Sequence, residues 1–452
     1  MSDPAQNTLI STQGRALAER ITARSSRVGI IGMGYVGLPL SVATFTAGYP
    51  VLGFDVDPLK ITMLNVGESY IGRIGNKTVA EMRASGRFEV TKDYARLADC
   101  DIIILCVPTP LNKHREPDLT YITGTTQSFS PFLRKGQLIA LESTTYPGTT
   151  REVMRPILEK GGLKSGHDFF LAFSPEREDP GNPDYHTATI PKVVGGDGLD
   201  ATALASQFYG SVVKRVVEVS SCEVAEAVKL TENIFRSVNI ALVNELKIIY
   251  DRMGINVWEV IEAAKTKPFG YMAFYPGPGL GGHCIPIDPF YLTWKAKEYN
   301  VHTRFIELAG EINTMAPVHV VEKLIDALSR RKQKSLSGSR ILMFGVAYKK
   351  NVEDTRESPA LTLIQLIEEK GGKVDFYDPF VVKIPHTREH DDMAGRKGIP
   401  FDVELFSGYD AALICTDHDG VDYLAIANSI DLIIDTRNAM KNVVDRSGIV
   451  RA

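Results

Sequence analysis

Cysteine is scarce in this sequence, and long apolar runs are absent. Five cysteines occur in 452 residues, widely spaced and with no CxxC pair. That pattern indicates reduced thiols in a cytoplasmic protein, and it predicts no metal site. No apolar run approaches the ~20 residues of a membrane-spanning helix, so no membrane insertion is expected. Residues 1–26 are polar, which excludes a secretory signal and leaves either a short amphipathic helix or a mobile leader.

The sequence also lacks an excess of charge of one sign. Its 51 lysines and arginines face 55 acidic residues, for a net charge of -4. This balance argues against a broad basic surface, so no nucleic-acid partner is expected. Hydrophobic residues make up 44% and charged residues 23%, as in an ordinary globular protein. At roughly 100–200 residues per domain, the length predicts two to four domains.

A glycine-rich turn near the N-terminus has the setting of a dinucleotide site. The apolar run Val28–Ile31 predicts a buried parallel strand, and residues 38–47 can continue as a helix. Between them, Gly32, Gly34 and Gly37 form a G-x-G-x-x-G motif. Such glycines let the backbone approach a pyrophosphate, and the helix N-terminus supplies N–H donors and positive potential.

An aspartate further along favours one dinucleotide over the other. Residues 51–54 predict a second strand, and Asp55 ends it 18 residues after Gly37. A carboxylate there accepts hydrogen bonds from the ribose hydroxyls and repels a 2′-phosphate, so NAD is favoured over NADP. Lys60 is close to Asp55 in sequence, and its positive charge would favour the 2′-phosphate of NADP.

Three further predicted strands in the first third end in polar residues. They lie within residues 101–110, 138–150 and 169–179. In an open parallel sheet, the carboxyl ends of the strands line the ligand crevice, so these ends belong beside the nicotinamide. Their polar residues include Glu142, Ser143, Thr144, Thr145, Glu176, Arg177 and Glu178.

The middle of the chain predicts long helices. Residues 221–253 contain neither proline nor glycine, and a second long segment covers about 303–331. Lys229, Asn233 and Arg236 recur at i, i+4 and i+7, which predicts a polar stripe that is either a solvated face or part of a site. Such a helical middle suits a dimer interface. One apolar face is predicted from Ala225, Val228, Phe235, Val238, Leu242, Leu246 and Ile249.

The last third repeats a strand–turn–helix–strand rhythm over residues 339–379, followed by two more predicted strands. Its turn has no G-x-G-x-x-G motif. It carries Lys349, Lys350, Asp354 and Arg356 instead, and the cations suit an anionic, phosphate-bearing ligand. The predicted fold class is therefore α/β, with two Rossmann-like doubly wound parallel-sheet domains joined by a helical middle domain.

Cys284 stands in the glycine-rich stretch GPGLGGHCIPIDPFYL. A helix predicted to begin at Asp288 would favour the thiolate, and the glycine N–H groups can stabilise an oxyanion. The alternative is a structural cysteine, but a glycine-rich loop is a poor core position, unlike the apolar strands around Cys106 and Cys415. NAD and a nucleophilic thiol together indicate oxidation of an aldehyde through a thiohemiacetal to a thioester, which water then cleaves.

From Val28 to about Asn438 the chain resembles the UDP-glucose/GDP-mannose dehydrogenases. This family oxidises the C6 alcohol of a nucleotide sugar to the carboxylate in two steps and reduces two NAD molecules. The motifs that carry the resemblance are GIIGMGYVGLPL, CVPTP, ESTTYPGTT, SPERED, KLTENIFRSVNIALVNE, GPGLGGHCIPIDP and GVAYKKNVEDTRESP.

The resemblance implies a role for each matching residue. Cys284 resembles the covalent nucleophile, Lys229 and Asn233 the pair that holds the reacting oxygen and a water, and Asp288 the aid to proton transfer. Thr144 and Glu176 match positions that organise water for thioester hydrolysis. The implied cofactor contacts are Gly32, Gly34, Tyr35, Val36, Gly37, Asp55, Lys60, Pro108, Thr109 and Thr144. The implied substrate contacts are Glu176, Arg177, Lys229, Asn233, Arg236, Gly279, Gly281, Lys349 and Arg356.

Departures from the pattern bear on the substrate. Ile287 replaces the lysine usual in UDP-glucose dehydrogenases, His283 replaces a serine, and SPERED is shorter than the usual glutamate motif. These changes resemble the branch that acts on UDP-N-acetylhexosamines, so UDP-N-acetylglucosamine is the expected substrate. UDP-glucose and UDP-N-acetylmannosamine remain alternatives. Two other readings are a non-catalytic nucleotide-sugar binding protein and a one-step hydroxyacid dehydrogenase. The role of His283, tuning the thiol or only packing, stays open.

The expected domains follow from these assignments. The protein is expected to be a homo-oligomer, either a dimer or a multiple of dimers. The expected boundaries are a leader at 1–26, an NAD-binding domain at 27–215, a central helical and dimerisation domain with the catalytic cysteine at 216–332, and a UDP-binding α/β domain at 333–452.

Overall fold

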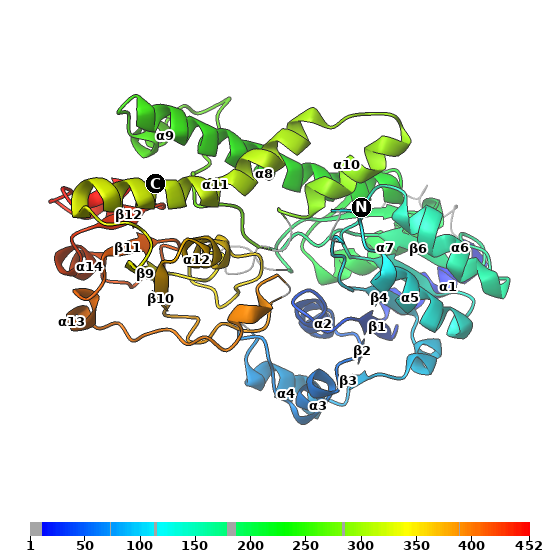
Figure 1. Cartoon of the computed structure of the whole chain (residues 1–452). Helices are drawn as coiled ribbons and strands as arrows, with labels where there is room; N and C mark the ends of the chain where they lie inside the picture. The colour runs from blue at the N-terminus through cyan, green and yellow to red at the C-terminus, as the bar shows by residue number, and fades with distance from the viewer. Residues whose placement is uncertain (1–10, 73, 113–114, 179–186, 283–284, 388) are drawn as a thin grey trace. The chain divides into compact units, whose positions relative to one another are not determined.

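The structure is a computed structural model, and it divides into two compact units that are described separately (Figure 1). Unit 1 comprises Met1–Glu232 and Phe290–Asn300, and unit 2 comprises Asn233–Pro289 and Val301–Ala452. Among the residues that the structure describes, no helix has the length and apolar character required to cross a membrane. The described residues are 11–72, 74–112, 115–178, 187–282, 285–387 and 389–452.

Unit 1 is built on an eight-stranded sheet in the order β3-β2-β1-β4-β5-β6-β7-β8. All neighbouring strands run parallel except β6 and β7, which pair antiparallel. The central strands are buried along their whole length, as strands covered by helices on both faces must be. The strands are β1 (Val28–Ile31), β2 (Val51–Phe54), β3 (Phe88–Thr91), β4 (Ile102–Leu105), β5 (Leu138–Leu141), β6 (Phe170–Phe173), β7 (Lys192–Gly196) and β8 (Val216–Glu218).

Apolar helix faces cover this sheet and form its core. The helix α1, within the polar N-terminal segment, is amphipathic: Leu17 and Ile21 are fully buried, and the helix packs on α7. The helices of unit 1 are α1 (Thr12–Thr22), α2 (Gly37–Thr46), α3 (Pro58–Val66), α4 (Asn76–Ala84), α5 (Thr120–Phe129), α6 (Arg155–Leu158) and α7 (Leu199–Val212). Two more helices contain residues of both units, α8 (Cys222–Arg252) and α10 (Asp288–Glu298).

Unit 2 contains a five-stranded, fully parallel sheet in the order β10-β9-β11-β12-β13. The helix α12 begins with the predicted cap, in which the Ser358 side chain accepts a hydrogen bond from the amide of Ala360 and Pro359 occupies the first turn. The strands are β9 (Arg340–Phe344), β10 (Lys373–Tyr377), β11 (Ala411–Ile414), β12 (Ile433–Asp435) and β13 (Ile449–Arg451). The helices are α9 (Val257–Lys265), α11 (Arg304–Ala327), α12 (Pro359–Glu369), α13 (Val403–Phe406) and α14 (Tyr423–Ser429).

The part of α8 in unit 2 does not bury the face that its apolar periodicity predicts. Phe235, Leu242 and Ile249 are each exposed, whereas Asn244 is buried. The amide of Asn244 donates to Asn313 Oδ1 on α11 at 3.1 Å, and its oxygen accepts from the backbone amide of Gly277 at 3.0 Å. Buried amides satisfied in this way fasten helix to helix and helix to loop.

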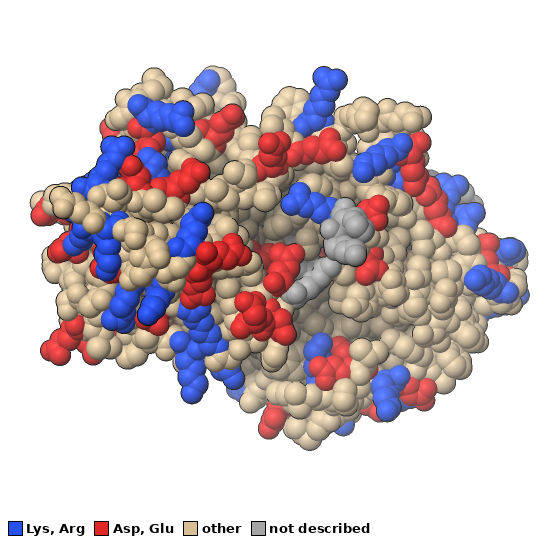
Figure 2. Space-filling view, viewed as in Figure 1, with Lys and Arg blue, Asp and Glu red and all other residues tan. Residues whose placement is uncertain are grey.

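The surface carries both signs of charge. On the face drawn in Figure 2, lysine and arginine side chains are interspersed with aspartate and glutamate. That mixture agrees with the nearly balanced composition of the sequence.

Candidate functional site

The three glycines of the turn after β1 have different physical roles. A Cβ at Gly37 would lie 1.8 Å from the carbonyl oxygen of Gly32, so that position must stay bare for the helix to pack. Gly32 has a φ of +91°, and a Cβ there would lie 2.3 Å from the carbonyl oxygen of Cys106. A Cβ at Gly34 would meet nothing within 4 Å. Gly34 therefore faces open space, where a pyrophosphate can approach the backbone.

The helix that follows this turn leaves its N-terminus available for an anion. Val36 is the N-cap residue of α2, and no side chain caps the helix or places an acid in its first turn. Unpaired N–H groups at a helix start attract phosphate oxygens. Tyr35, next to Gly34, is exposed. The turn thus fits the dinucleotide that its sequence predicts.

Asp55 closes the same turn from the end of β2. Its carboxylate accepts hydrogen bonds from the backbone amides of Met33 and Asp57, both at 2.9 Å. Lys60 Nζ lies 3.5 Å from Asp55 Oδ2. The carboxylate is therefore held at the carboxyl edge of the sheet, beside the strand end where a ribose is expected.

The loop after β4 is fixed by hydrogen bonds to its neighbours. The Ser143 hydroxyl accepts from the amide of Val107 at 2.9 Å and donates to the carbonyl of the same residue at 2.7 Å. The Tyr291 hydroxyl donates to the carbonyl of Thr109 at 3.0 Å. Thr109 is buried and Pro108 exposed, so the predicted cofactor contacts in this loop occupy a defined strand end.

A buried charge network lies at the ends of β5, β6 and β7. Lys192 Nζ donates to Glu142 Oε2 at 2.8 Å and lies 4.0 Å from Glu176 Oε2, while the Tyr209 hydroxyl donates to Glu142 Oε1 at 2.6 Å. Burial raises the pKa of Glu142 even though Lys192 opposes the shift. Burial alone would lower the pKa of Lys192, but the two carboxylates outweigh it and raise that pKa. The network fixes one side of Glu176, a predicted catalytic residue.

Two further predicted residues in unit 1 lie near this network. Arg177 donates to Glu232 at 2.5 and 3.3 Å and to the carbonyl of Pro191 at 2.6 Å, so its guanidinium is engaged by the protein. Thr144 is half-buried at the end of β5. Arg177 thus holds the SPERED segment against α8, which sequence patterns alone did not indicate.

The predicted stripe on α8 is divided between buried and exposed positions. Lys229 and Asn233, one turn apart on the helix, are buried, whereas Arg236 is exposed. The Asn233 amide donates to Asp288 Oδ2 at 2.5 Å, which joins two of the predicted catalytic residues. Asp288 starts α10 as predicted and is itself buried.

The glycine-rich loop is packed against protein rather than open. A Cβ at Gly281 would lie 2.9 Å from Tyr348 Cβ and 3.1 Å from Pro359 Cδ. Gly279 has a φ of +146°, and a Cβ there would lie 3.1 Å from Pro359 Cβ. The glycines thus permit close packing on the C-terminal sheet domain. His283 and Cys284 lie outside the described residues.

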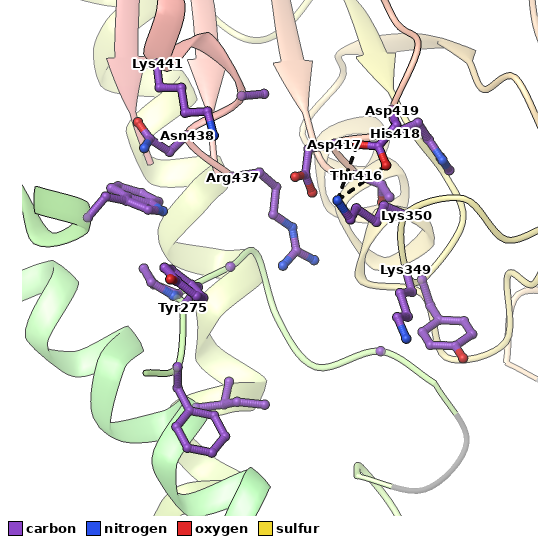
Figure 3. A pocket seen from close by; sticks show the side chains of 18 of the residues that line it. Tyr275, Lys349, Lys350, Thr416, Asp417, His418, Asp419, Arg437, Asn438 and Lys441 are labelled. Atoms are coloured by element: carbon purple, nitrogen blue, oxygen red, sulfur yellow. Dashed lines mark hydrogen bonds and ion pairs between the residues drawn. The ribbon is translucent and has the colours of Figure 1, made fainter. Parts of the chain in front are cut away.

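Unit 2 encloses a cavity of about 1170 Å³ beside this loop (Figure 3). Its walls come from α8, α9, the loop 273–281 and the loops after β9, β11 and β12. Aromatic side chains at Trp258, Phe274, Tyr275, Tyr348 and Tyr423 provide surfaces on which a flat base can stack. The volume and lining suit a nucleotide sugar.

Cations exceed acids in the lining of this cavity. Lys350 pairs with Asp419 at 3.3 Å, and Figure 3 shows the guanidinium of Arg437 directed into the cavity. Arg437 Nε donates to the carbonyl of Cys415 at 2.9 Å, which holds the group in place. The basic lining residues are Arg236, Lys265, Lys349, Lys350, Arg437 and Lys441, and the acidic ones are Glu262, Asp417 and Asp419.

Sequence reasoning found part of this lining and missed part. Lys349, Arg236, Gly279 and Gly281 line the cavity as predicted contacts, whereas Arg356 pairs with Asp354 at 2.6 Å and is not among the lining residues. Arg437 was missed, and so was Lys192 in unit 1. Arg437 follows β12 and Lys192 begins β7, so a charged residue at the edge of a buried strand is the signal that marks them.

The four cysteines that the structure describes have no reactive setting. Burial raises the pKa of Cys100 and of Cys415 to about 12, and it raises that of Cys106 and Cys222 as well. All four are free thiols. Cys100, Cys222 and Cys415 are buried core residues, and Cys106, directly after β4, is half-buried.

Known proteins are similar to this chain in sequence and in fold over most of its length. Sequence models of the UDP-glucose/GDP-mannose dehydrogenase family match as NAD binding domain at residues 26–213, central domain at 223–315 and UDP binding domain at 342–442. A UDP-N-acetyl-D-glucosamine 6-dehydrogenase of Pseudomonas aeruginosa is 35% identical over 87% of this chain and 90% of its own length. A UDP-N-acetyl-D-mannosamine dehydrogenase of Pyrococcus horikoshii is 35% identical over 92% and 96%. A solved structure of the latter kind, UDP-D-ManNAc dehydrogenase from P. horikoshii, superposes with a TM-score of 0.83 at 34% identity, covering 91% of this chain and 96% of that one.

The glycine roles predict opposite outcomes for two alanine variants. Gly34→Ala should weaken NADH binding about tenfold or more, because its methyl enters the space for the pyrophosphate, while the melting temperature stays unchanged. Gly37→Ala should cost about 3 kcal/mol of unfolding free energy, because its methyl meets the backbone of Gly32. Fluorescence titration with NADH and thermal denaturation measure both effects. Wild-type affinity in Gly34→Ala would refute its assigned role.

Removing the buried cation should make stability depend on pH. Lys192→Met leaves Glu142 buried without its ion pair, which should cost about 3–5 kcal/mol at pH 8. The raised folded-state pKa of Glu142 favours its protonated form, so this loss should shrink toward pH 5 and grow as the pH rises through that pKa.

Urea denaturation at several pH values measures this dependence. Adding Glu142→Gln to Lys192→Met removes the titrating group and should flatten the pH profile. An unchanged pH profile in the double variant would show that another group is responsible.

Proposed function

The chain belongs to the UDP-glucose/GDP-mannose dehydrogenase family and is an NAD-dependent UDP-sugar dehydrogenase, and from that premise we propose that it oxidises UDP-N-acetylglucosamine to the 6-carboxylate. The observation that carries the proposal is the large, cation-lined cavity of unit 2 beside the glycine loop that leads to Cys284. The overall conversion is alcohol plus water and two NAD⁺ to acid, two NADH and two protons.

The cofactor residues act by holding and orienting. Gly34 and the N-terminus of α2 would receive the pyrophosphate, and Asp55 the ribose hydroxyls, with Lys60 beside the carboxylate. Bound NAD supplies a hydride acceptor for each of the two oxidations. The nicotinamide ring would lie against the loop that carries Pro108 and Thr109 and against the strand end at Thr144.

The first oxidation requires that the C6 hydroxyl lose a proton as it loses a hydride. We assign Lys229 and Asn233 to hold that oxygen or a water, one helical turn apart on α8. Asp288, which accepts a hydrogen bond from Asn233, would assist the proton's departure. The aspartate is buried, so the proton moves within a site shielded from bulk water.

The second oxidation requires a tetrahedral adduct. The Cys284 thiolate would attack the aldehyde carbon and form a thiohemiacetal, whose loss of hydride gives a thioester. Water then adds to the thioester carbonyl, and the carboxylate and the thiolate separate. Glu176, held beside Lys192, and Thr144 would organise this water.

The UDP moiety is assigned to the cavity of unit 2. Arg437 and Lys349 would face the diphosphate, and the aromatic lining would receive the base. Gly279 and Gly281 would contact the sugar through their backbone, since their missing side chains let the loop pack on Tyr348 and Pro359. Arg356 would act by fixing this loop, since its carbonyl accepts a hydrogen bond from the amide of Gly282 at 3.3 Å.

UDP-N-acetylmannosamine is the second candidate substrate. A relative that acts on it is as similar in sequence as the relative that acts on UDP-N-acetylglucosamine. The two sugars differ only in the configuration at C2. The shortened SPERED segment and Ile287 resemble the branch of the family that acts on UDP-N-acetylhexosamines. They therefore support an N-acetylhexosamine over glucose.

The assembly and the domain boundaries are also proposals. A second copy of the chain would cover the exposed stripe Phe235, Leu242 and Ile249, spaced by seven residues on α8, to give a dimer or a multiple of dimers. Sedimentation equilibrium tests this. Boundaries near residues 215 and 332 are supported by the ranges of the three family models. A cytoplasmic location stays a prediction from the scarcity of cysteine.

The NADH yield from limiting sugar tests the proposed reaction. UDP-N-acetylglucosamine should give two NADH per molecule in excess NAD, with little NADH formed from UDP-glucose or UDP-N-acetylmannosamine. A yield of two from a different sugar would correct the substrate and keep the mechanism. A yield of one from every sugar would contradict the two-step reaction.

A further inference from the structure

A second cavity in unit 2, of about 430 Å³, lies between α8, α11, the start of α9 and β13. Its lining includes Lys247, His319, Arg331, Arg446 and Arg451, and a single acid, Asp251. The segments come together from four separate parts of the sequence. No role in the reaction above uses this cavity.

Lys247 is the most deeply placed of its cations. The side chain is 6% exposed, and no carboxylate among the described residues lies within ion-pair distance of it. Asp251, one turn further along α8, is paired with Lys323 instead. Burial lowers the pKa of Lys247 to about 7, with Arg437 and Lys323 adding to the shift and Asp251 opposing it. A buried ammonium group gains stability when an anion binds beside it.

The arginines of the cavity keep donors for a ligand. Arg331 donates to the carbonyl of Ser447 at 2.5 Å, and Arg446 donates to the carbonyl of Val443 at 3.1 Å and to that of Lys441. In the described part of the chain, no acidic side chain pairs with Arg331, Arg446 or Arg451. A guanidinium has five N–H donors, so backbone carbonyls satisfy only a part of each.

His319 adds a polar atom that lacks a partner. Its Nε2 is buried and has no hydrogen-bond partner among the described residues. Burial lowers the pKa of His319, with the nearby Lys247 as the next cause, so the ring is neutral at pH 7. A neutral imidazole can donate to a phosphate oxygen from one nitrogen.

We propose that this cavity binds a small phosphate-bearing anion at a site separate from the nucleotide-sugar cavity. Several guanidinium groups with one buried ammonium match the oxygens of a phosphate, which accept hydrogen bonds in pairs from a planar guanidinium. The volume of about 430 Å³ admits a diphosphate or a hexose phosphate.

The two cavities are adjacent, and this adjacency predicts coupling. Trp258 lines both of them, and it is the only residue they share among those described. Arg437, which lines the nucleotide-sugar cavity, is close enough to Lys247 to lower its pKa. An anion beside Lys247 reduces the positive potential at Arg437, so its binding opposes that of UDP, and UDP weakens it reciprocally.

Isothermal titration with inorganic pyrophosphate, at saturating UDP and NADH, tests the site on the whole chain. Saturating the two sites proposed above, for NAD and for UDP, removes pyrophosphate binding at those places. We expect saturable binding, weakened tenfold or more in Lys247→Met and in Arg451→Gln, and unchanged in the control Lys334→Gln. Lys334 pairs with Asp410 and lies outside the cavity lining. Thermal denaturation identifies variants that fail to fold. Arg451 is only partly buried, so Arg451→Gln is less disruptive to folding than Lys247→Met.

A parallel titration with a hexose phosphate identifies the source of the phosphate. Tighter binding of the hexose phosphate would indicate a metabolite ester, and tighter binding of pyrophosphate a free inorganic anion; both support the site. The absence of saturable binding of either probe would overturn the proposal. Equal binding by Arg451→Gln, Lys247→Met and wild type would overturn it too.

Discussion

Each sheet depends on one tight constraint, the left-handed glycine through which the chain leaves its first strand. In unit 1 a Cβ at Gly32 would lie 2.3 Å from the carbonyl oxygen of Cys106, and in unit 2 a Cβ at Gly345 would lie 2.4 Å from that of Thr416. Both glycines have positive φ, +91° and +82°. Because no side chain fits there, the turn passes directly under a neighbouring strand end and exposes backbone N–H groups at the sheet edge.

An aspartate at the end of the next strand accepts hydrogen bonds from this turn in both units, but the two aspartates are held differently. Asp55 accepts one amide hydrogen bond from the turn. Asp378 accepts two, from Val346 and Ala347, and a third contact from His418 at 3.0 Å. Burial would raise the pKa of Asp378, but these contacts outweigh it and lower that pKa. The Asp378 carboxylate is thus occupied by hydrogen bonds within the protein. The cavity of unit 2 is lined mainly by basic side chains.

The sequence was a good guide where local pattern decides the structure. The strand Val28–Ile31 was predicted residue for residue, because a strand buried on both faces must be apolar at every position. The cap at Ser358 and the start of α10 at Asp288 also follow from neighbouring residues alone. The alternative left open for the N-terminal segment is settled for residues 12–22, which form the amphipathic helix α1.

The features that local pattern did not predict depend on contacts between residues far apart in the sequence. The periodicity of α8 defines its apolar residues but not what covers them, so the exposure of Leu242 and the burial of Asn244 could not be read from it. The resemblance implies substrate contacts at Gly279 and Gly281, yet a Cβ at Gly281 would meet Tyr348, some seventy residues away in sequence. The ion pair of Lys192 with Glu142 likewise could not be predicted, because it forms only when β7 packs in the sheet.

Covalent catalysis at Cys284 is tested most directly by mass spectrometry of the enzyme quenched during turnover of UDP-N-acetylglucosamine with NAD. The peptide that contains Cys284 should carry the mass of the uronyl thioester. The adduct should be absent without NAD and in the Cys284→Ser variant. Acid formed at the wild-type rate by Cys284→Ser, with no adduct on the wild-type peptide, would contradict the mechanism.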